Sequence, residues 1–375
     1  MGARRRGPQA IAGVVAAFLT AAIAVPLNAA PTPVRAHAVV GPVQVGTSFS
    51  PRRAEALGLD YRVAFQTLLG LHFRVIRIPV YWDETDATGP GRTDWLMEQA
   101  KAAGQPIVLS VGMKSLGWPE YYIPARFQPT GDQFGARISD NAELRTAALG
   151  FVEQTITRYR GSPELVAWQI ENEPLNRAGP QRWWIGDDFL AQEMAVARGL
   201  DSRPLIVNTF THFNMGMDRA SSSRFDLRSL LGFDGATPEK RSLAVLGRGD
   251  ILGLDVYTRI AYRQGDQVRV SQADADWDDS VARWHATAES QGKGAWVTEA
   301  QAEPWEADWA GIDNPKSFGP EDVTATFGAL KQAGVSTALL WGSEYWLHRA
   351  GQGDGRWLET VRSLLAAEAK SPPLN

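Results

Sequence analysis

Short apolar runs alternate along the chain with longer segments in which apolar residues recur every three or four positions. The short runs are rich in β-branched and aromatic side chains, which is typical of buried strands. They cover residues 43–49, 73–79, 106–111, 165–170, 205–208, 251–257, 295–299 and 337–341. Because these runs are almost continuously apolar, they predict a parallel sheet that helices cover on its outer face.

The longer segments predict helices. Their apolar residues repeat at helical spacing over residues 64–71, 96–103, 148–159, 277–288, 323–330 and 358–365. Gly104 is placed to end one helix and Pro320 to begin another. Residues 210–249 are irregular, apart from a weak helical repeat around residues 225–231.

Eight strand–helix units predict an α/β fold, the (β/α)8 or TIM barrel, with long loops at the carboxyl ends of the strands. A doubly wound open sheet is the alternative, and it would usually carry a glycine-rich phosphate loop after the first strand. Residues 45–50 contain only one glycine, so we favour the barrel. Without an internal repeat or a linker, we expect residues 39–375 to form a single domain.

The first 38 residues have the features of a signal peptide. Arg4, Arg5 and Arg6 precede an apolar stretch at residues 11–27, and Ala36-His37-Ala38 matches a cleavage motif. We therefore expect a secreted or extracytoplasmic protein. An uncleaved membrane anchor is the alternative, although the stretch is short, and no later apolar run is long enough to span a membrane.

Composition excludes several classes of function. The net charge is −4 and no basic cluster exceeds the N-terminal one, so we expect no nucleic-acid partner. There are no cysteines, and the five histidines stand alone, so we expect neither a metal site nor another cofactor. A G-x-S-x-G motif is absent. The 14 tryptophans exceed what a core of this size needs, and aromatic rings suit the flat apolar faces of sugars.

Alternation along the strands predicts which side chains face the barrel interior, because successive strand residues point to opposite sides. In residues 251–257, the leucines and valine at even positions should face the helices, so Asp255 and Tyr257 should face inward. In residues 73–79, Ile76 and Ile78 should face the helices and Arg77 the interior.

The same alternation applies to two further strands. With Trp168 and Ile170 facing out, Glu171 and Glu173 should face in. With Trp296 and Thr298 facing out, Glu299 should also face in. Four strands thus direct polar or ionisable groups at the axis, close to their carboxyl ends.

Two carboxylates on different strands suit the cleavage of a glycosidic bond, in which one protonates the leaving oxygen and the other attacks or stabilises the sugar. Asn172 is placed to bind a sugar hydroxyl and Tyr257 to orient the nucleophile. Arg77 is expected to keep that nucleophile ionised, and a charged Glu299 to keep Glu173 protonated. The alternative is a buried salt-bridge network of Arg77 with two glutamates.

The order of these residues resembles glycoside hydrolase clan A, over residues 43–365. The resemblance rests on Glu171-Asn172-Glu173-Pro174, Tyr257, Glu299 and Trp341. It implies a retaining (β/α)8 enzyme in which Glu173 is the acid/base, Glu299 the nucleophile and Trp341 a platform for the sugar being cleaved.

Within the clan, Arg77-Ile78-Pro79-Val80 resembles the second-strand motif of the large cellulase family, family 5. That family usually has a histidine after its third strand and another two positions before the sixth-strand tyrosine. Here residues 108–114 lack a histidine, and Asp255 stands before Tyr257. Residues 169–173 also resemble a motif of family 35 β-galactosidases. We therefore expect a divergent, cellulase-like member of the clan.

Three further tryptophans, Trp82, Trp118 and Trp305, are predicted to contact the substrate. Glu303 and Glu306 flank Trp305, and we expect them to be solvated loop residues or to line the cleft. The predicted function is hydrolysis of a β-linked oligo- or polysaccharide resembling a glucan or mannan. A secreted carbohydrate-binding barrel without catalytic activity is the alternative.

Overall fold

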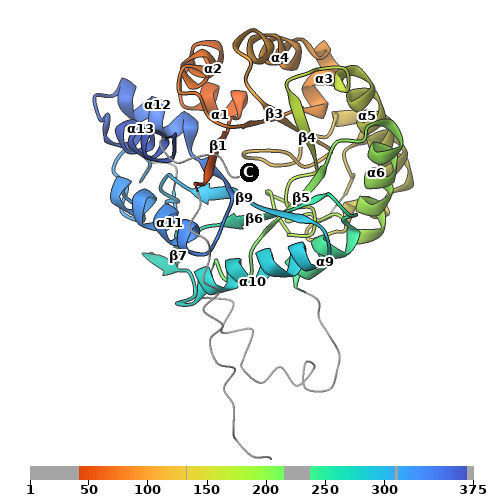
Figure 1. Cartoon of the computed structure of the whole chain (residues 1–375). Helices are drawn as coiled ribbons and strands as arrows, with labels where there is room; N and C mark the ends of the chain where they lie inside the picture. Colours follow the sequence, from red (N-terminus) through yellow and green to blue (C-terminus); the bar gives the residue numbers. More distant parts are fainter. Residues whose placement is uncertain (1–41, 132, 215–236, 309–310, 370–375) are drawn as a thin grey trace, which may run out of the picture. The chain divides into compact units, whose positions relative to one another are not determined.

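The computed structural model describes residues 42–131, 133–214, 237–308 and 311–369. Within them, eight parallel strands close into a barrel in the order β1-β10-β9-β6-β5-β4-β3-β2 (Figure 1). The predicted (β/α)8 barrel is confirmed, because every predicted run overlaps one of these strands. Their bounds are β1 Gln44–Ser48, β2 Ile76–Pro79, β3 Ile107–Val111, β4 Leu165–Ile170, β5 Leu205–Phe210, β6 Ile251–Val256, β9 Gly294–Gln301 and β10 Thr337–Trp341.

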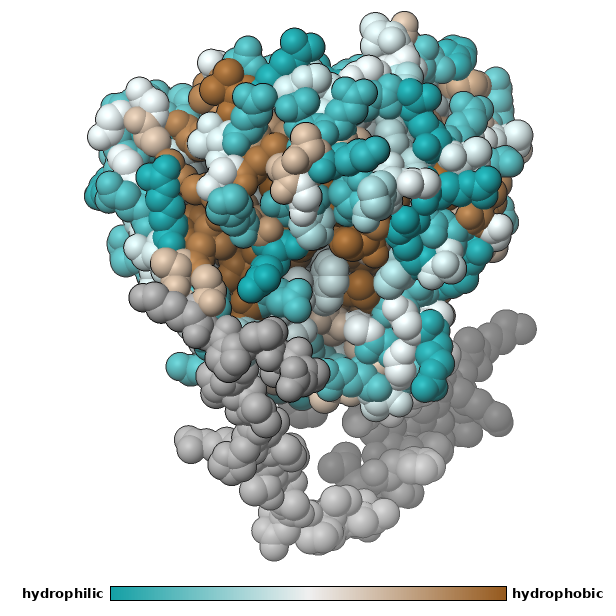
Figure 2. Space-filling view, turned by 45° about the horizontal axis from the view of Figure 1, so that its top comes forward, coloured by the Kyte–Doolittle hydropathy of each residue, from teal (hydrophilic) through white to brown (hydrophobic). Residues whose placement is uncertain are grey.

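Helices form a ring outside the strands (Figure 1). Their apolar faces pack on the barrel, and on the side shown in Figure 2 mostly hydrophilic side chains cover the surface, with apolar ones recessed between them. The helices are α1 Pro51–Ala56, α2 Tyr61–Leu69, α3 Trp82–Thr88, α4 Gly91–Ala103, α5 Ala142–Tyr159, α6 Asp187–Leu200, α9 Pro238–Val245, α10 Trp277–Ser290, α11 Pro320–Gln332, α12 Ser343–Gly351 and α13 Arg356–Ala369, with short 3-10 turns at Ala125–Phe127 and Ile138–Asp140. In the part of the chain described, no helix is long and apolar enough to cross a bilayer.

Each predicted helical repeat lies on or overlaps one of these helices, while several elements were not predicted. α6 buries Glu193 among its apolar residues, which interrupts the pattern that would have revealed it. α9 is short. In the antiparallel hairpin of β7 (Arg259–Gln264) and β8 (Gln267–Gln272), β8 is mostly exposed and β7 buries only Ile260 and Ala261. The signal peptide at residues 1–38 and the weak helix at residues 225–231 lie outside the described residues.

The barrel interior has two layers because strand side chains alternate. The lower layer is an apolar cluster against which Trp296 packs, consisting of Val75, Val108, Ala167, Ile206, Ile251 and Leu339. Two residues further along their strands, Arg77, Ser110, Gln169 and Asn208 make the next layer polar. The interior is therefore closed by apolar side chains below, and its polar groups lie toward the carboxyl ends of the strands.

A β-bulge at Thr298 corrects one prediction. Val297 pairs with Leu254, but Asp255 pairs with Glu299, so Thr298 is an extra residue on β9. Trp296 and Thr298 face inward, not outward as predicted: Trp296 packs on the lower layer and Thr298 bonds to Asp255. Because of this extra residue, Glu299 faces inward as well. Simple alternation predicted that orientation for Glu299, but it derived it from outward orientations of Trp296 and Thr298 that are wrong.

Candidate functional site

A cleft of about 280 Å³ opens above the polar layer, at the carboxyl ends of the barrel strands. Its lining contains all the predicted site residues except Arg77 and Trp82, namely Asn172, Glu173, Tyr257, Glu299, Trp118, Trp305 and Trp341. Parallel strands carry their carboxyl ends to one side of a barrel, and this brings together residues far apart in the sequence.

Glu299 is held in one orientation by two donors. The Arg77 guanidinium donates to Oε1 at 2.7 Å, and the Tyr257 hydroxyl donates to Oε2 at 2.5 Å. Glu299 is only 4% exposed, so these bonds act where water screens them little. Together the two donors hold both carboxylate oxygens in fixed positions, as a carboxylate nucleophile requires.

Arg77 lies beneath the cleft and is fully buried. Its Nε donates to the Ser48 hydroxyl at 2.9 Å and its Nη1 to Gln169 Oε1 at 2.7 Å, while Nη2 serves Glu299. Because Nε, Nη1 and Nη2 each donate to one of these acceptors and the side chain is not exposed to the cleft, Arg77 does not contact a substrate directly. It orients Glu299.

Glu173 lies in the loop after β4, separated from Ile170 by Glu171 and Asn172, and its backbone has a φ of +45°, a left-handed conformation that non-glycine residues rarely adopt. Its amide N–H donates to Asn208 Oδ1 at 2.8 Å, which helps to hold this conformation. Burial raises the pKa of the Glu173 carboxyl to about 8, with Lys114 lowering the pKa and Glu299 raising it. A carboxyl that remains protonated near neutral pH suits a general acid.

Asn208, on β5, joins the parts of the site that surround Glu173. Its Nδ2 donates to Asn172 Oδ1 at 2.9 Å and to Asp255 Oδ2 at 2.7 Å. Asn172 Oδ1 also accepts from Gln169 at 3.1 Å, so the oxygen of the Asn172 amide is committed and its nitrogen remains to serve the cleft. Gly253 leaves the space for this packing, since a Cβ there would lie 2.6 Å from the Asn208 side chain.

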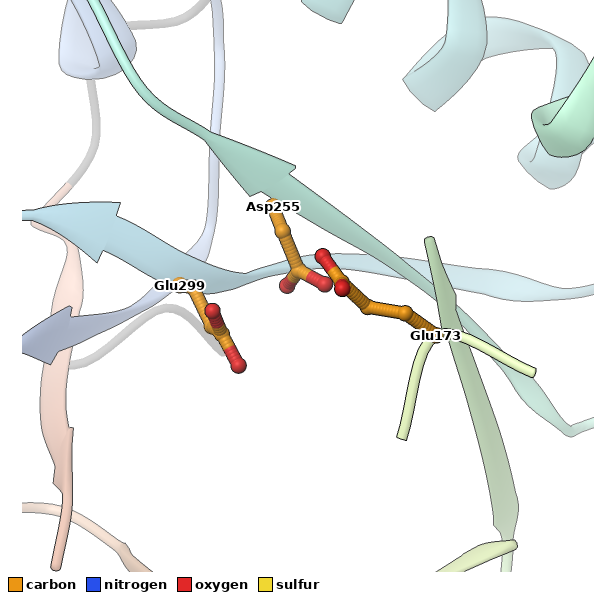
Figure 3. A group of neighbouring side chains, drawn as sticks. All are labelled: Glu173, Asp255 and Glu299. Carbon is orange, nitrogen blue, oxygen red and sulfur yellow. The ribbon is translucent and has the colours of Figure 1, made fainter. Parts of the chain in front are cut away.

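Three carboxyl groups from β4, β6 and β9 converge, with one oxygen each of Glu173, Asp255 and Glu299 lying within 4.8 Å of the others. Figure 3 shows the three side chains turned toward one another. Burial, Glu299 and Glu173 raise the pKa of Asp255 well above its ordinary value. Carboxylates at this separation are able to hold a divalent cation, but Arg77 and Lys114 already contact Glu299 and Glu173 and supply the positive charge.

Trp82 does not lie in the cleft, which corrects its prediction as a substrate-binding residue. It begins α3 and is 4% exposed. Its indole stacks on Phe127 and Phe151, with ring centroids 5.6 and 5.4 Å away. Trp82 is thus part of the core between α3 and α5.

Glu171 does not face the axis as predicted, and Arg77 bonds to Ser48, Gln169 and Glu299 instead of Glu171. Its Oε1 accepts the N–H of Met113 and its Oε2 the N–H of Lys114, at 2.8 and 2.6 Å. The buried carboxyl of Glu193 on α6 lies beside it and interacts with it electrostatically. Glu171 is buried and joins the end of β3 to the end of β4. Its reversed backbone, with φ of +59°, turns the side chain away from the axis.

The two acids that flank Trp305 differ in their surroundings. Glu303 is 6% exposed and pairs with Arg53 at 2.7 Å, so the expectation of a solvated side chain is wrong for it. Glu306 lies on the rim of the cleft and accepts the N–H groups of Lys316 and Ser317.

The platforms expected for sugars are exposed to different degrees. Trp118 is 71% exposed and Trp305 is 42% exposed, both on loops at the mouth of the cleft. Trp305 packs edge-on against Tyr257, with ring centroids 5.0 Å apart. Trp341, at the end of β10, lies under the Arg53 guanidinium at 5.7 Å from its ring centre.

Lys114, Asn208 and Asp255 are site residues to which the sequence analysis gave no role. Lys114 lies in the loop after β3, separated from Val111 by Gly112 and Met113, just as Glu173 lies beyond the end of β4. Asn208 is the only amide in the strand that begins Leu205-Ile206-Val207. A charged or amide residue at the carboxyl end of an apolar run is the signal that selected Glu173, and it would have selected these residues too.

No family model matches the sequence, and no curated protein matches it. Solved structures share its fold. The chain is similar to the β-galactosidase of Rahnella sp. R3, with 14% identity, a TM-score of 0.52, and 88% of this chain covering 56% of the other. It is similar to an exo-β-1,4-mannosidase from Opitutaceae bacterium strain TAV5, with 13% identity, a TM-score of 0.53, and coverages of 87% and 59%.

A third similar structure is the AHE enzyme from Alicyclobacillus herbarius, with 12% identity, a TM-score of 0.52, and coverages of 88% and 98%. The chain thus spans little more than half of the two glycosidases and nearly all of this enzyme. At these identities, the likeness shows a common barrel fold.

Proposed function

We propose that this protein is a secreted, retaining β-glycoside hydrolase that acts on a β-linked oligo- or polysaccharide of the glucan or mannan type. Glu173 is the acid/base and Glu299 the nucleophile. Asn172 and the tryptophans of the cleft bind the sugar, and Arg77 and Tyr257 orient Glu299.

The observation that carries the proposal is the spacing of the two carboxyls. Oxygens of Glu173 and Glu299 lie within 4.8 Å of one another. Retaining glycosidases place their carboxyl groups about 5–5.5 Å apart, whereas inverting enzymes leave about 6.5–9.5 Å for a water molecule. The short separation supports direct attack by Glu299 on the anomeric carbon.

The difference between the two environments supports the assignment of roles. Glu299 accepts bonds from a guanidinium and a phenol, which stabilise the anion. Glu173 is a carboxyl whose pKa is raised to about 8, chiefly by burial. In the first step, Glu299 attacks and Glu173 gives its proton to the leaving oxygen. In the second, Glu173 takes a proton from the water that releases the sugar from Glu299.

Similar structures that are named as β-galactosidase and exo-β-1,4-mannosidase support a β-linked hexose as substrate. The exposed rings of Trp118 and Trp305 at the mouth support a chain longer than one sugar, because each offers a separate stacking surface. The signal-peptide features of residues 1–38 support secretion.

The test is a panel of nitrophenyl β-glycosides and β-linked polysaccharides, with the anomeric configuration of the first product followed by NMR. Retention is expected. Glu299→Gln and Glu173→Gln should each lose at least about a thousandfold in kcat, as expected when a nucleophile or an acid is removed. Addition of azide to Glu173→Ala should yield a glycosyl azide of retained configuration, and addition to Glu299→Ala one of inverted configuration.

A sugar-binding protein without turnover is the second candidate, and the exposed tryptophans at the mouth of the cleft favour it equally. Calorimetry distinguishes the two. Binding of an oligosaccharide without any product after prolonged incubation would support the binding protein and reject the hydrolase.

A further inference from the structure

Lys114 is a buried cation for which the double-displacement reaction supplies no role. It follows β3 and has no exposed surface. Its Nζ donates to the carbonyl oxygen of Glu173 at 2.9 Å, lies 3.6 Å from Glu173 Oε2, and lies 3.1 Å from Glu120 Oε2. A buried lysine is costly unless nearby anions hold it, so its place beside the acid/base calls for an explanation.

The backbone of Lys114 is as fixed as its side chain. Its N–H donates to Glu171 and its carbonyl oxygen accepts the N–H of Asn172, which ties the end of β3 to the end of β4. The ammonium group therefore keeps a constant distance from the Glu173 carboxyl. Such a fixed charge acts on the carboxyl without first having to move.

The other ionisable groups that face Glu173 come from β2, β6, β9 and the loop after β3. Glu299 on β9 and Asp255 on β6 are acids, Tyr257 adds a hydroxyl, and Arg77 is bonded to Glu299. Glu120 is an acid on the loop after β3. Among the described residues, Lys114 is the cation that contacts Glu173 itself.

Lys114 remains charged in this setting. Burial alone would lower its pKa, but Glu120, Glu173 and Glu299 together raise the pKa above its ordinary value. The ammonium and Glu120 balance each other while Glu173 is protonated. When Glu173 loses its proton, Lys114 is the cation against which the new carboxylate forms.

We propose that Lys114, balanced by Glu120, is a positioning residue that sets how readily Glu173 releases and recovers its proton. The inference rests on the proposed function of Glu173. In the first step, the proton passes from Glu173 to the leaving oxygen and the negative charge appears 3.6 Å from Lys114 Nζ. In the second step, the proton of the attacking water returns to Glu173 and the charge disappears. Lys114 itself keeps its proton throughout.

Two neutral substitutions should shift the alkaline limb of the pH profile in opposite directions. Lys114→Met removes the cation, so the pKa of Glu173 should rise and the alkaline limb of kcat/KM should move up by about one pH unit. Glu120→Gln removes the competing anion, so the limb should move down. A residue that only maintained structure would lower activity in both variants without opposite shifts. Unmoved limbs, or limbs that moved the same way, would overturn the proposal.

Two more variants guard against misfolding and test the charge itself. Lys114→Met leaves Glu120 without its partner, so the double variant Lys114→Met/Glu120→Gln provides a pair that is neutral at both positions. Its limb should lie between those of the single variants. Lys114→Arg keeps the positive charge and should restore the limb toward its wild-type position, even if kcat stays low.

A direct measurement does not depend on turnover. The infrared absorption of protonated carboxyl groups, followed against pH, gives the titration of Glu173 as the difference between the wild type and Glu173→Gln. The same difference in the Lys114→Met background should titrate at higher pH. If the wild type hydrolysed no glycoside, the proposed function would fail while this titration still decided the role of Lys114. Titration of Glu173 at the same pH in both backgrounds would reject it.

Discussion

Arg77 and Glu299 form an ion pair of 2.7 Å across the barrel interior, and the two side chains are 0% and 5% exposed. Bulk water therefore cannot solvate either charge if its partner is removed. Removing one partner of such a pair leaves the other charge buried and uncompensated.

Arg77→Met should therefore be destabilised by about 3–5 kcal/mol, the usual cost of leaving a buried charge unpaired. It should also lose turnover, because Glu299 would lose the donor that holds its Oε1 in place for attack. Denaturant unfolding and kinetics at several pH values measure the two effects. Arg77→Lys, which keeps the charge but not the three-way contact with Ser48, Gln169 and Glu299, should lie between the wild type and Arg77→Met.

Tyr257→Phe removes one hydrogen bond to Glu299 and little volume. Hydrogen bonds to charged groups contribute about 1.5–3 kcal/mol, so kcat should fall roughly 10- to 100-fold. The ring of Tyr257 packs on Trp305 with centroids 5.0 Å apart, and phenylalanine keeps this contact, so KM should change little. An unaltered kcat would show that Arg77 alone orients the carboxylate.

Two tryptophans should respond in opposite ways to truncation. Trp118→Ala should raise KM for oligosaccharides and leave the free energy of unfolding unchanged, because the ring is 71% exposed. Trp82→Ala should cost about 3–5 kcal/mol of stability, because it empties a stacked core site. Its KM should stay near the wild-type value. A stability loss in Trp118→Ala would mean that its loop depends on the ring for packing.

The buried acids Glu171 and Glu193 predict how stability depends on pH. Burial raises the pKa of Glu171 to about 7 from an ordinary 4.5 and raises that of Glu193 well above the same value. An acid whose pKa is raised on folding favours the folded state most below pH 4.5, and the contribution declines as pH rises toward 7.

Glu193→Gln should reduce this decline, since it removes one of the two ionisable groups and leaves an amide able to bond to Glu171. Urea unfolding at pH 5 and pH 8 measures the slope. The control is Glu143→Gln, at an exposed position in the first turn of α5, which should leave the slope as it is. An identical slope in Glu193→Gln would contradict the assignment.

Chelation should leave the activity unchanged. Glu173, Asp255 and Glu299 come close enough to bind a divalent cation, but Lys114 and Arg77 already neutralise part of their charge. Activity after dialysis against EDTA should match that of untreated enzyme, and added Ca²⁺ or Mg²⁺ should not increase it. A loss that the metal restored would show that the carboxyl cluster requires an ion.

The sequence was sufficient to predict the barrel because its strands are apolar runs bounded by turns, and buried parallel strands leave that pattern regardless of their loops. It was also sufficient to select Glu173 and Glu299, since each is an acid at the carboxyl end of such a run. Arg77 was predicted to face inward by alternation, which holds wherever a strand is regular.

Alternation failed where the backbone departs from a regular strand. The bulge at Thr298 reverses the facing of Trp296 and Thr298. The positive φ at Glu171 directs its side chain to β3 and α6. The contacts that Lys114 and Asn208 make with Glu173 depend on which strands are neighbours in the barrel. The pattern of residues along the chain carries no information on distances across the barrel, so it could not predict these contacts.

The apolar layer of Val75, Val108, Ala167, Ile206, Ile251 and Leu339 lies directly below the polar groups. The acids of the site therefore exchange protons with solvent only through the mouth of the cleft. Once a sugar fills that mouth, Glu173 keeps through the first chemical step the protonation state that it had when the substrate bound. Acidity of the medium should accordingly govern kcat/KM, which reports the free enzyme, more strongly than kcat.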